Sequence, residues 1–161
     1  MSQNIDTEKK YTSESLLCKG EKNDCVVRSF ASSFNIPYEK AHQYVEDVFN
    51  RKPKQGAERV VTIIDNSPKI LGHKVEALGE TFKYEFKVGY YSGRRLFNGS
   101  NKNNRRISYT TGSFIKAFPK GVFLIIVSGH MFTIKDGIIF GNIADSRQLR
   151  SRIQNVYRIT K

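Results

Sequence analysis

The chain has 161 residues, of which 39% are apolar and 12% aromatic, so it can form one domain with its own core and is not expected to be disordered. Residues 122–127, its most apolar run, are far shorter than the ~20 residues of a membrane span, and the polar first fifteen residues lack the apolar core of a signal peptide. No membrane partner is therefore expected. The formal net charge of +12 leaves two alternatives open, an anionic partner such as nucleic acid or a basic surface without a specific partner.

The cysteine content argues against a secreted, disulfide-bonded protein. Only Cys18 and Cys25 are present, which is too few for a disulfide framework. A reducing, cytoplasmic location is the simplest interpretation. We expect residues 1–15 to be a flexible arm and residues 16–161 to form a single domain, because no internal repeat or second composition class occurs.

Two helices are predicted near the N-terminus. Asn23 and Asp24 are residue types that cap helices, and apolar residues recur behind them at helical spacing. The pattern predicts a buried helix over residues 24–34 with Cys25 in its first turn. Pro37 suits the first turn of a second helix, which should end near Asn50. The buried face expected for that second helix consists of Ala41, Tyr44, Val45 and Val48.

The C-terminal half predicts a sheet. Residues 73–78 fit a first strand, and residues 122–127 are apolar on both faces, which is typical of a central strand. Residues 131–135 and 138–142 flank Asp136-Gly137, a strong hairpin signal. Residues 156–159 form the last predicted strand. The fold class is therefore α+β, with N-terminal helices packed on a C-terminal antiparallel β-sheet.

The position of Cys25 suggests a nucleophile. Unpaired N–H groups and the macrodipole at a helix N-terminus favour a thiolate over a thiol. A buried, inert cysteine is the alternative. A nucleophilic thiol needs a base, and His130 is the best of the three histidines because it follows Gly129 at the junction of a buried strand and the hairpin. His42 is expected on the exposed side of its helix, and His73 at the start of a strand.

The hairpin turn decides which residue orients the imidazole. A three-residue turn with a bulge at Gly137 would pair His130 with Asn142, whose amide oxygen can hold the ring. A two-residue turn would place Ile143 opposite His130 instead. We therefore expect Asn142 as the third member of the site, with Asp145 as the alternative.

These residues resemble a known family. The stretch Asn23-Asp-Cys-Val-Val-Arg-Ser, the segment Ile36-Pro-Tyr-Glu, and Gly129-His130 with Asp136-Gly137 look like small papain-like cysteine proteins of phages and bacteria. The resemblance covers roughly residues 20–75 and 110–159. It implies a papain-like fold without a cofactor or metal, and thiolate attack on a protein, peptide, isopeptide or amide bond. A phage-encoded member would act in the host cytoplasm.

One departure from the family pattern concerns the oxyanion. Papain-like enzymes usually carry a glutamine about six residues before the cysteine, where this chain has Lys19. Asn23 is the nearest side-chain amide, and Lys19 itself is a second candidate donor. A catalytically weak or inactive papain-like domain is therefore the alternative. Such a domain would bind a host protein or nucleic acid through a basic surface that includes Arg94, Arg95, Arg105 and Arg106.

Overall fold

The computed structural model describes residues 4–78, 98–100 and 106–161. Its N-terminal elements are β1 (Asn4–Asp6), α1 (Thr7–Glu14), α2 (Leu16–Lys19), α3 (Cys25–Ser33), α4 (Tyr38–Phe49) and α5 (Val60–Asp65). The remaining elements are β2 (Lys69–Ile70), β3 (His73–Ala77), β4 (Asn98–Ser100), β5 (Arg106–Ser108), α7 (Thr111–Ala117), β6 (Val122–Val127), β7 (His130–Lys135), β8 (Ile138–Gly141), α8 (Ile143–Arg147) and β9 (Asn155–Thr160). None of the helices in the described ranges is long and apolar enough to cross a membrane.

Within the described residues, seven strands form one mixed sheet, in the order β1-β8-β7-β6-β9-β3-β2. The α+β class is as predicted, and β6 is the central strand as its apolar sequence indicated. The prediction of a purely antiparallel sheet is wrong, because β1 pairs in parallel with β8. The sequence signal for β1 is weak, since it is a three-residue edge strand. Strands β4 and β5 form a separate antiparallel pair.

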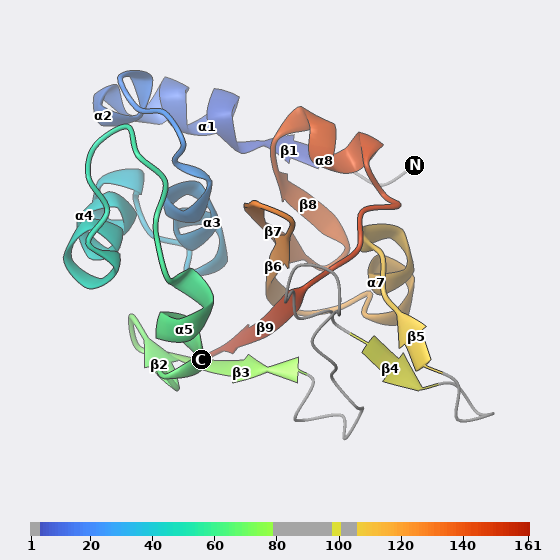
Figure 1. Cartoon of the computed structure of the whole chain (residues 1–161). Helices are drawn as coiled ribbons and strands as arrows, with labels where there is room; N and C mark the ends of the chain where they lie inside the picture. Colours follow the sequence, from blue (N-terminus) through green and yellow to red (C-terminus); the bar gives the residue numbers. More distant parts are fainter. Residues whose placement is uncertain (1–3, 79–97, 101–105) are drawn as a thin grey trace.

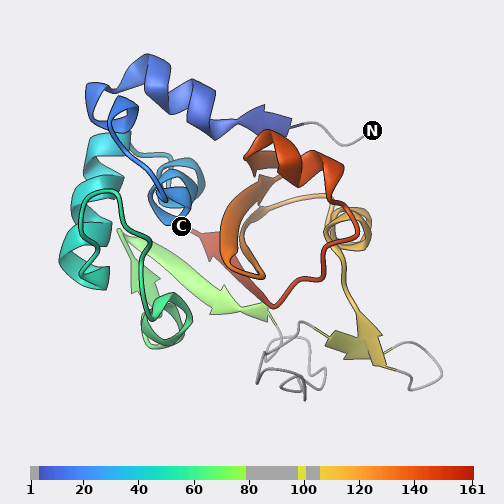
Figure 2. The same ribbon diagram turned by 45° about the horizontal axis from the view of Figure 1, so that its top comes forward.

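Helices cover both faces of the sheet. Helices α3 and α4 lie on one face and α7 on the other (Figures 1 and 2). Alternate residues of β6 serve the two cores: Leu124 belongs to the cluster beneath α3, whereas Phe123 and Ile125 belong to the cluster beneath α7. A strand with a core on each side must be apolar at every position, which explains the unbroken run of residues 122–127.

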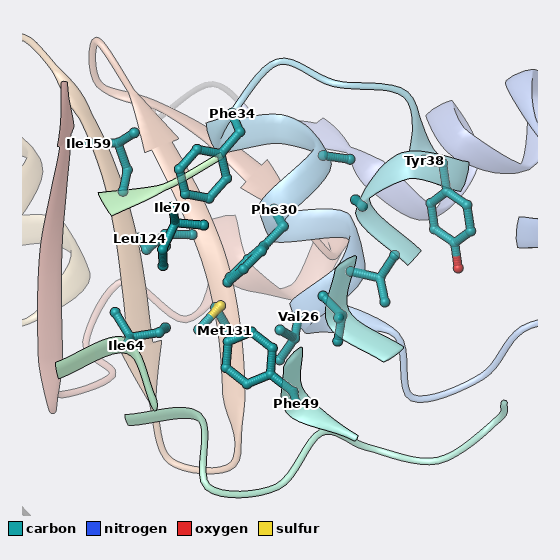
Figure 3. Packing of buried hydrophobic residues seen from close by; sticks show 14 of the residues in the cluster. Val26, Phe30, Phe34, Tyr38, Phe49, Ile64, Ile70, Leu124, Met131 and Ile159 are labelled. Atoms are coloured by element: carbon teal, nitrogen blue, oxygen red, sulfur yellow. The ribbon is translucent and has the colours of Figure 1, made fainter. Parts of the chain in front are cut away.

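Helix α3 is the buried element around which the first core forms. Its aromatic side chains Phe30 and Phe34 point toward Leu124 and Ile70 of the sheet (Figure 3). The predicted buried face of this helix is therefore confirmed. The predicted face of α4 is correct for Ala41 and Val45, which are fully buried. The prediction fails for Val48, which is 41% exposed, and Phe49 packs into the core in its place.

The predicted flexible arm is wrong for residues 4–14. These residues form β1 and α1. The side chain of Asp6 caps α1 by accepting hydrogen bonds from two backbone N–H groups. Tyr11 is buried, and its hydroxyl lies 3.0 Å from the Ser32 hydroxyl of α3. A single buried tyrosine on an otherwise polar helix gives little hydrophobic periodicity, so the sequence pattern concealed this docking.

The hairpin register also corrects the prediction. Lys135 pairs with Ile138 and Ile134 with Ile139, which leaves a two-residue turn of Asp136 and Gly137. Both turn residues have positive φ, 47° and 79°. Such a turn matches the right-handed twist of the strands and is preferred in two-residue hairpins. The bulged three-residue turn, and with it the pairing of His130 with Asn142, is therefore wrong.

Candidate active site

Cys25 is the first residue of α3, as the sequence predicted. Asn23, with φ of 52°, turns the chain into the helix. Asp24 occupies the N-cap position, yet its side chain makes no capping hydrogen bond. The buried carboxylate instead accepts hydrogen bonds from Arg28 Nε at 2.9 Å and the Tyr38 hydroxyl at 2.7 Å. The first turn of α3 is therefore free of a side-chain cap, which favours negative charge at Cys25.

His130 begins strand β7 directly after the β6–β7 turn. Gly129 has φ of 68°, a left-handed conformation that suits glycine, and places His130 next to the last residue of β6. The His130 side chain lines the same pocket as the Cys25 thiol and lowers the pKa of that thiol. Its Nε2 donates to Asp145 Oδ2 at 3.0 Å, and its ring lies against Phe132. The structure thus brings together the predicted nucleophile and the predicted base.

Asp145 lies in the first turn of α8 and has a side chain only 7% exposed. Its Oδ2 accepts the His130 hydrogen bond and also the Asn142 backbone N–H at 2.7 Å. Gly141 makes room for this carboxylate, because a Cβ at that position would overlap Asp145 Oδ2. The carboxylate is therefore held in place by the end of β8 as well as by its own helix.

The prediction that the Asn142 amide oxygen holds the imidazole is wrong. The Asn142 Oδ1 accepts a hydrogen bond from Arg28 Nη1 at 2.8 Å. Strand β8 ends at Gly141, so Asn142 serves as the N-cap residue of α8 rather than as a strand residue opposite His130. The alternative candidate, Asp145, is the residue that orients the ring. Arg28 was not singled out from the sequence, although an Asp-Arg pair at i,i+4 on the helix of the nucleophile was a visible signal.

The electrostatics of the pair favour a thiolate facing an imidazolium. Burial alone would raise the pKa of the Cys25 thiol, but hydrogen bonds from the His130 side chain and the Met131 backbone, with the charges of His130 and Arg28, bring it below its ordinary value. Burial alone would lower the pKa of His130. The Asp145 and Cys25 side chains outweigh it and raise that pKa to about 9. Each group therefore stabilises the charged form of the other.

Cys18 provides a contrast within the same chain. It is buried, and its sulfur lies 3.8 Å from Asp24 Oδ2. Burial first, and then the negative charge of Asp24, raise the pKa of the Cys18 thiol to about 11. A thiol of this kind is inert at neutral pH. Both cysteines are free thiols.

Two pockets meet at His130. The larger has a volume of about 700 Å³, and the other about 550 Å³. Side chains that line the larger pocket include Cys25, Arg28, Arg59, Val60, Ile126 and His130. Side chains that line the other include Ser128, His130, Asp145, Gln148, Arg152 and Gln154. The thiol therefore opens into the larger pocket, and the histidine borders both pockets.

The two predicted oxyanion donors differ in position. Lys19 is the exposed last residue of α2 and is absent from the lining of both pockets among the described residues. Asn23 lines the larger pocket, but its Nδ2 donates to the Lys54 carbonyl at 3.1 Å. The structure therefore places Asn23, and not Lys19, in the lining of the pocket that contains the thiol.

A buried ionic cluster fixes the loops that border the larger pocket. Glu21 Oε2 lies 2.6 Å from Arg51 Nη2 and 3.2 Å from His42 Nε2. Glu21 Oε1 accepts the Lys54 backbone N–H at 3.1 Å. The expectation that His42 is exposed is wrong, because this carboxylate draws it inward. His73 is not part of this cluster. It begins β3, as predicted, and its Nδ1 lies 3.0 Å from the Leu71 carbonyl oxygen.

The remaining candidate sites are a nucleic-acid-binding surface and a metal site. Arg94, Arg95 and Arg105 lie outside the described residues. Arg106 begins β5, and its side chain is not described. Among the residues that the structure describes, no group of three or more His, Cys, Asp or Glu side chains is arranged to hold a metal ion.

Comparison of the chain with protein-family models, with curated proteins and with solved structures finds no match in any of the three.

Proposed function

We propose that this protein is a cysteine peptidase or a related thiol acyl-transfer hydrolase of the papain-like type. Cys25 is the nucleophile, His130 the general base and acid, and Asp145 the group that orients the imidazole. One observation carries the proposal: the Cys25 thiol shares a pocket with the His130 ring, whose Nε2 is hydrogen-bonded to the Asp145 carboxylate. Nucleophile, base and orienting group in this order are what thiol catalysis requires.

The chemistry follows from the charges of the pair. The Cys25 thiolate attacks the carbonyl carbon of the scissile bond, and the carbonyl π electrons move to oxygen. When the tetrahedral intermediate collapses, the C–N bond breaks and His130 donates its proton to the leaving amine. A water molecule then loses a proton to His130 and attacks the thioester. Cleavage of the C–S bond releases the acid and restores the thiolate.

Oxyanion stabilisation is the weak part of this site. The backbone N–H of Cys25 would be one donor, and the Asn23 amide, which lines the same pocket, is the candidate side-chain donor. Loss of one such donor typically slows an enzyme by about 10²–10³. We therefore propose a hydrolase of low turnover, whose substrate is a protein or peptide bond, an isopeptide or an amide. The proposed location is cytoplasmic, in the host if a phage encodes the chain.

The pH dependence of Cys25 alkylation tests the proposal. Iodoacetamide should modify Cys25 with an apparent pKa well below the ~8.5 of a free cysteine. Cys18 is the internal control because its raised pKa predicts slow modification in the same sample. The variant His130→Ala should return Cys25 to ordinary thiol behaviour. Ordinary behaviour of Cys25 in the unmodified protein would exclude a catalytic thiolate.

A second candidate function is supported by the net charge of +12. An inactive papain-like domain could bind an acidic host protein or nucleic acid through its basic surface. Binding to single-stranded nucleic acid would weaken steeply as salt rises, because phosphate contacts release counterions. Absence of binding at low salt would exclude nucleic acid as the partner.

A further inference from the structure

We propose that Arg28 is a positioning residue that joins the helix of the nucleophile to the helix of Asp145. The inference rests on the proposed function, since it assigns Arg28 a role in keeping Cys25, His130 and Asp145 aligned. The role is new to the site because Arg28 does not hydrogen-bond to any of those three side chains among the contacts of the described residues. It acts through Asn142.

The guanidinium of Arg28 is at the centre of a buried network. Its side chain is 8% exposed. Nε donates to Asp24 Oδ1 at 2.9 Å, within the same helix. Nη1 donates to two other elements, Thr7 Oγ1 of α1 and Asn142 Oδ1 at the start of α8, both at 2.8 Å. A planar guanidinium can hold several acceptors in a fixed arrangement, which a lysine ammonium cannot do.

Asn142 passes this constraint to the catalytic carboxylate. Its side chain is held by Arg28, while its backbone N–H donates to Asp145 Oδ2. Asp145 Oδ2 is also the atom that accepts the His130 hydrogen bond. A shift of Asn142 would therefore move the carboxylate that orients the imidazole. Asn4 of β1 donates to the Asn142 carbonyl at 3.2 Å and anchors the same residue from the other side.

The desolvation cost of burying this charged network favours a functional role over a purely stabilising one. A buried ion pair such as Arg28–Asp24 adds little stability on average, because desolvation offsets the attraction. Here the pair keeps a positive charge beside the nucleophile, one turn along α3 from Cys25. The same guanidinium lines the pocket into which the thiol opens. Positioning and electrostatic support for the thiolate thus come from one side chain.

Two matched variants separate this role from general packing. Asn142→Ala removes the α8 acceptor of Arg28 Nη1 but keeps the Arg28–Asp24 pair and the residue 142 backbone N–H. Thr7→Val removes the other acceptor of the same nitrogen, with nearly the same shape and no link to α8. The readouts are the apparent pKa of Cys25 alkylation and the His130 pKa from an NMR titration, with thermal unfolding as the check on folding.

We expect Asn142→Ala to raise the Cys25 alkylation pKa by about one unit and to lower the His130 pKa, as loss of a favourable neighbour does. Thr7→Val should leave both values unchanged. Arg28→Lys should resemble Asn142→Ala, and the double variant should add no further shift, because both changes break one connection.

The outcomes distinguish this inference from the proposed function. An ordinary thiol pKa in the unmodified protein would refute the proposed function itself. A lowered pKa that persists in Asn142→Ala would refute the role of Arg28 alone. Equal shifts in Asn142→Ala and Thr7→Val would also refute it, because general loosening of the fold would then account for the effect.

Discussion

His130 Nε2 lies 3.0 Å from Asp145 Oδ2, although the two residues come from elements that do not pair in the sheet. His130 starts β7, whereas Asp145 lies beyond the end of β8, in the first turn of α8. The contact exists because β8 stops at Gly141 and α8 begins directly after Asn142, which brings Asp145 to the start of β7. The first turn of a helix therefore supplies the carboxylate.

The Asp145 charge should control the titration of His130. Asp145→Asn keeps the size of the side chain and removes its charge. The pKa of His130, raised to about 9 in the unmodified protein, should fall toward the ordinary value of 6.5. NMR titration of the His130 ring measures this shift. The control is Asp136→Asn, which changes a carboxylate that accepts the Gly121 N–H and is remote from His130. An unchanged His130 pKa in Asp145→Asn would contradict the assignment.

Stability should depend on pH through the same histidine. The folded pKa of His130 is raised from 6.5 to about 9, so its contribution to the free energy of unfolding is complete below about pH 6.5 and is lost as the pH rises through 9. The Cys25 pKa is lowered, so the contribution of that thiolate is present above the ordinary thiol pKa and is lost as the pH falls through the lowered value.

Urea unfolding at pH 6, 8 and 10 checks the histidine part of this linkage. The difference in the free energy of unfolding between the unmodified protein and His130→Ala should be largest at pH 6 and should shrink toward pH 10. A difference that stays constant across this range would mean that His130 has the same pKa in the folded and unfolded chain.

Gly141→Ala should damage the site although it replaces none of the titrating residues. A Cβ at position 141 would overlap Asp145 Oδ2 and would come within 2.9 Å of Phe132 Cβ. The carboxylate must then move away from His130, and the apparent pKa of Cys25 alkylation should rise. Gly20→Ala is the control, since its Cβ would meet nothing closer than 3.9 Å. Unchanged alkylation in Gly141→Ala would show that the Asp145 position is not critical.

The Glu21 cluster should be a main source of stability for the loops beside the larger pocket. Glu21→Gln leaves the buried Arg51 guanidinium without its charged partner. Breaking a buried ion pair from one side typically costs about 3–5 kcal/mol, and we expect a loss in that range on urea unfolding. The control Glu14→Gln breaks the exposed pair with Lys10 and should change stability little. Equal effects of the two variants would contradict a special role for the buried cluster.

Local sequence patterns were sufficient where local rules decide the structure. The spacing of Val26, Phe30 and Phe34 correctly predicted α3 with Cys25 at its start. The apolar run of β6 correctly predicted the central strand. Where local patterns were weak, tertiary contacts decided the structure. Strand β1 and helix α1 hold few apolar residues, and they are ordered by docking on β8 and α3.

The same distinction between local pattern and tertiary contact applies to the residues of the candidate site. The sequence by itself determined Cys25 and His130 as the predicted nucleophile and base, because a thiol at a helix start and a histidine after a strand–glycine junction are local features. Only the tertiary structure decided in favour of Asp145 over Asn142. That choice depended on a hairpin register one residue different from the one expected and on the helix that follows. A shift of one residue reverses the direction of every side chain in a strand, so position along the chain could not fix the third residue.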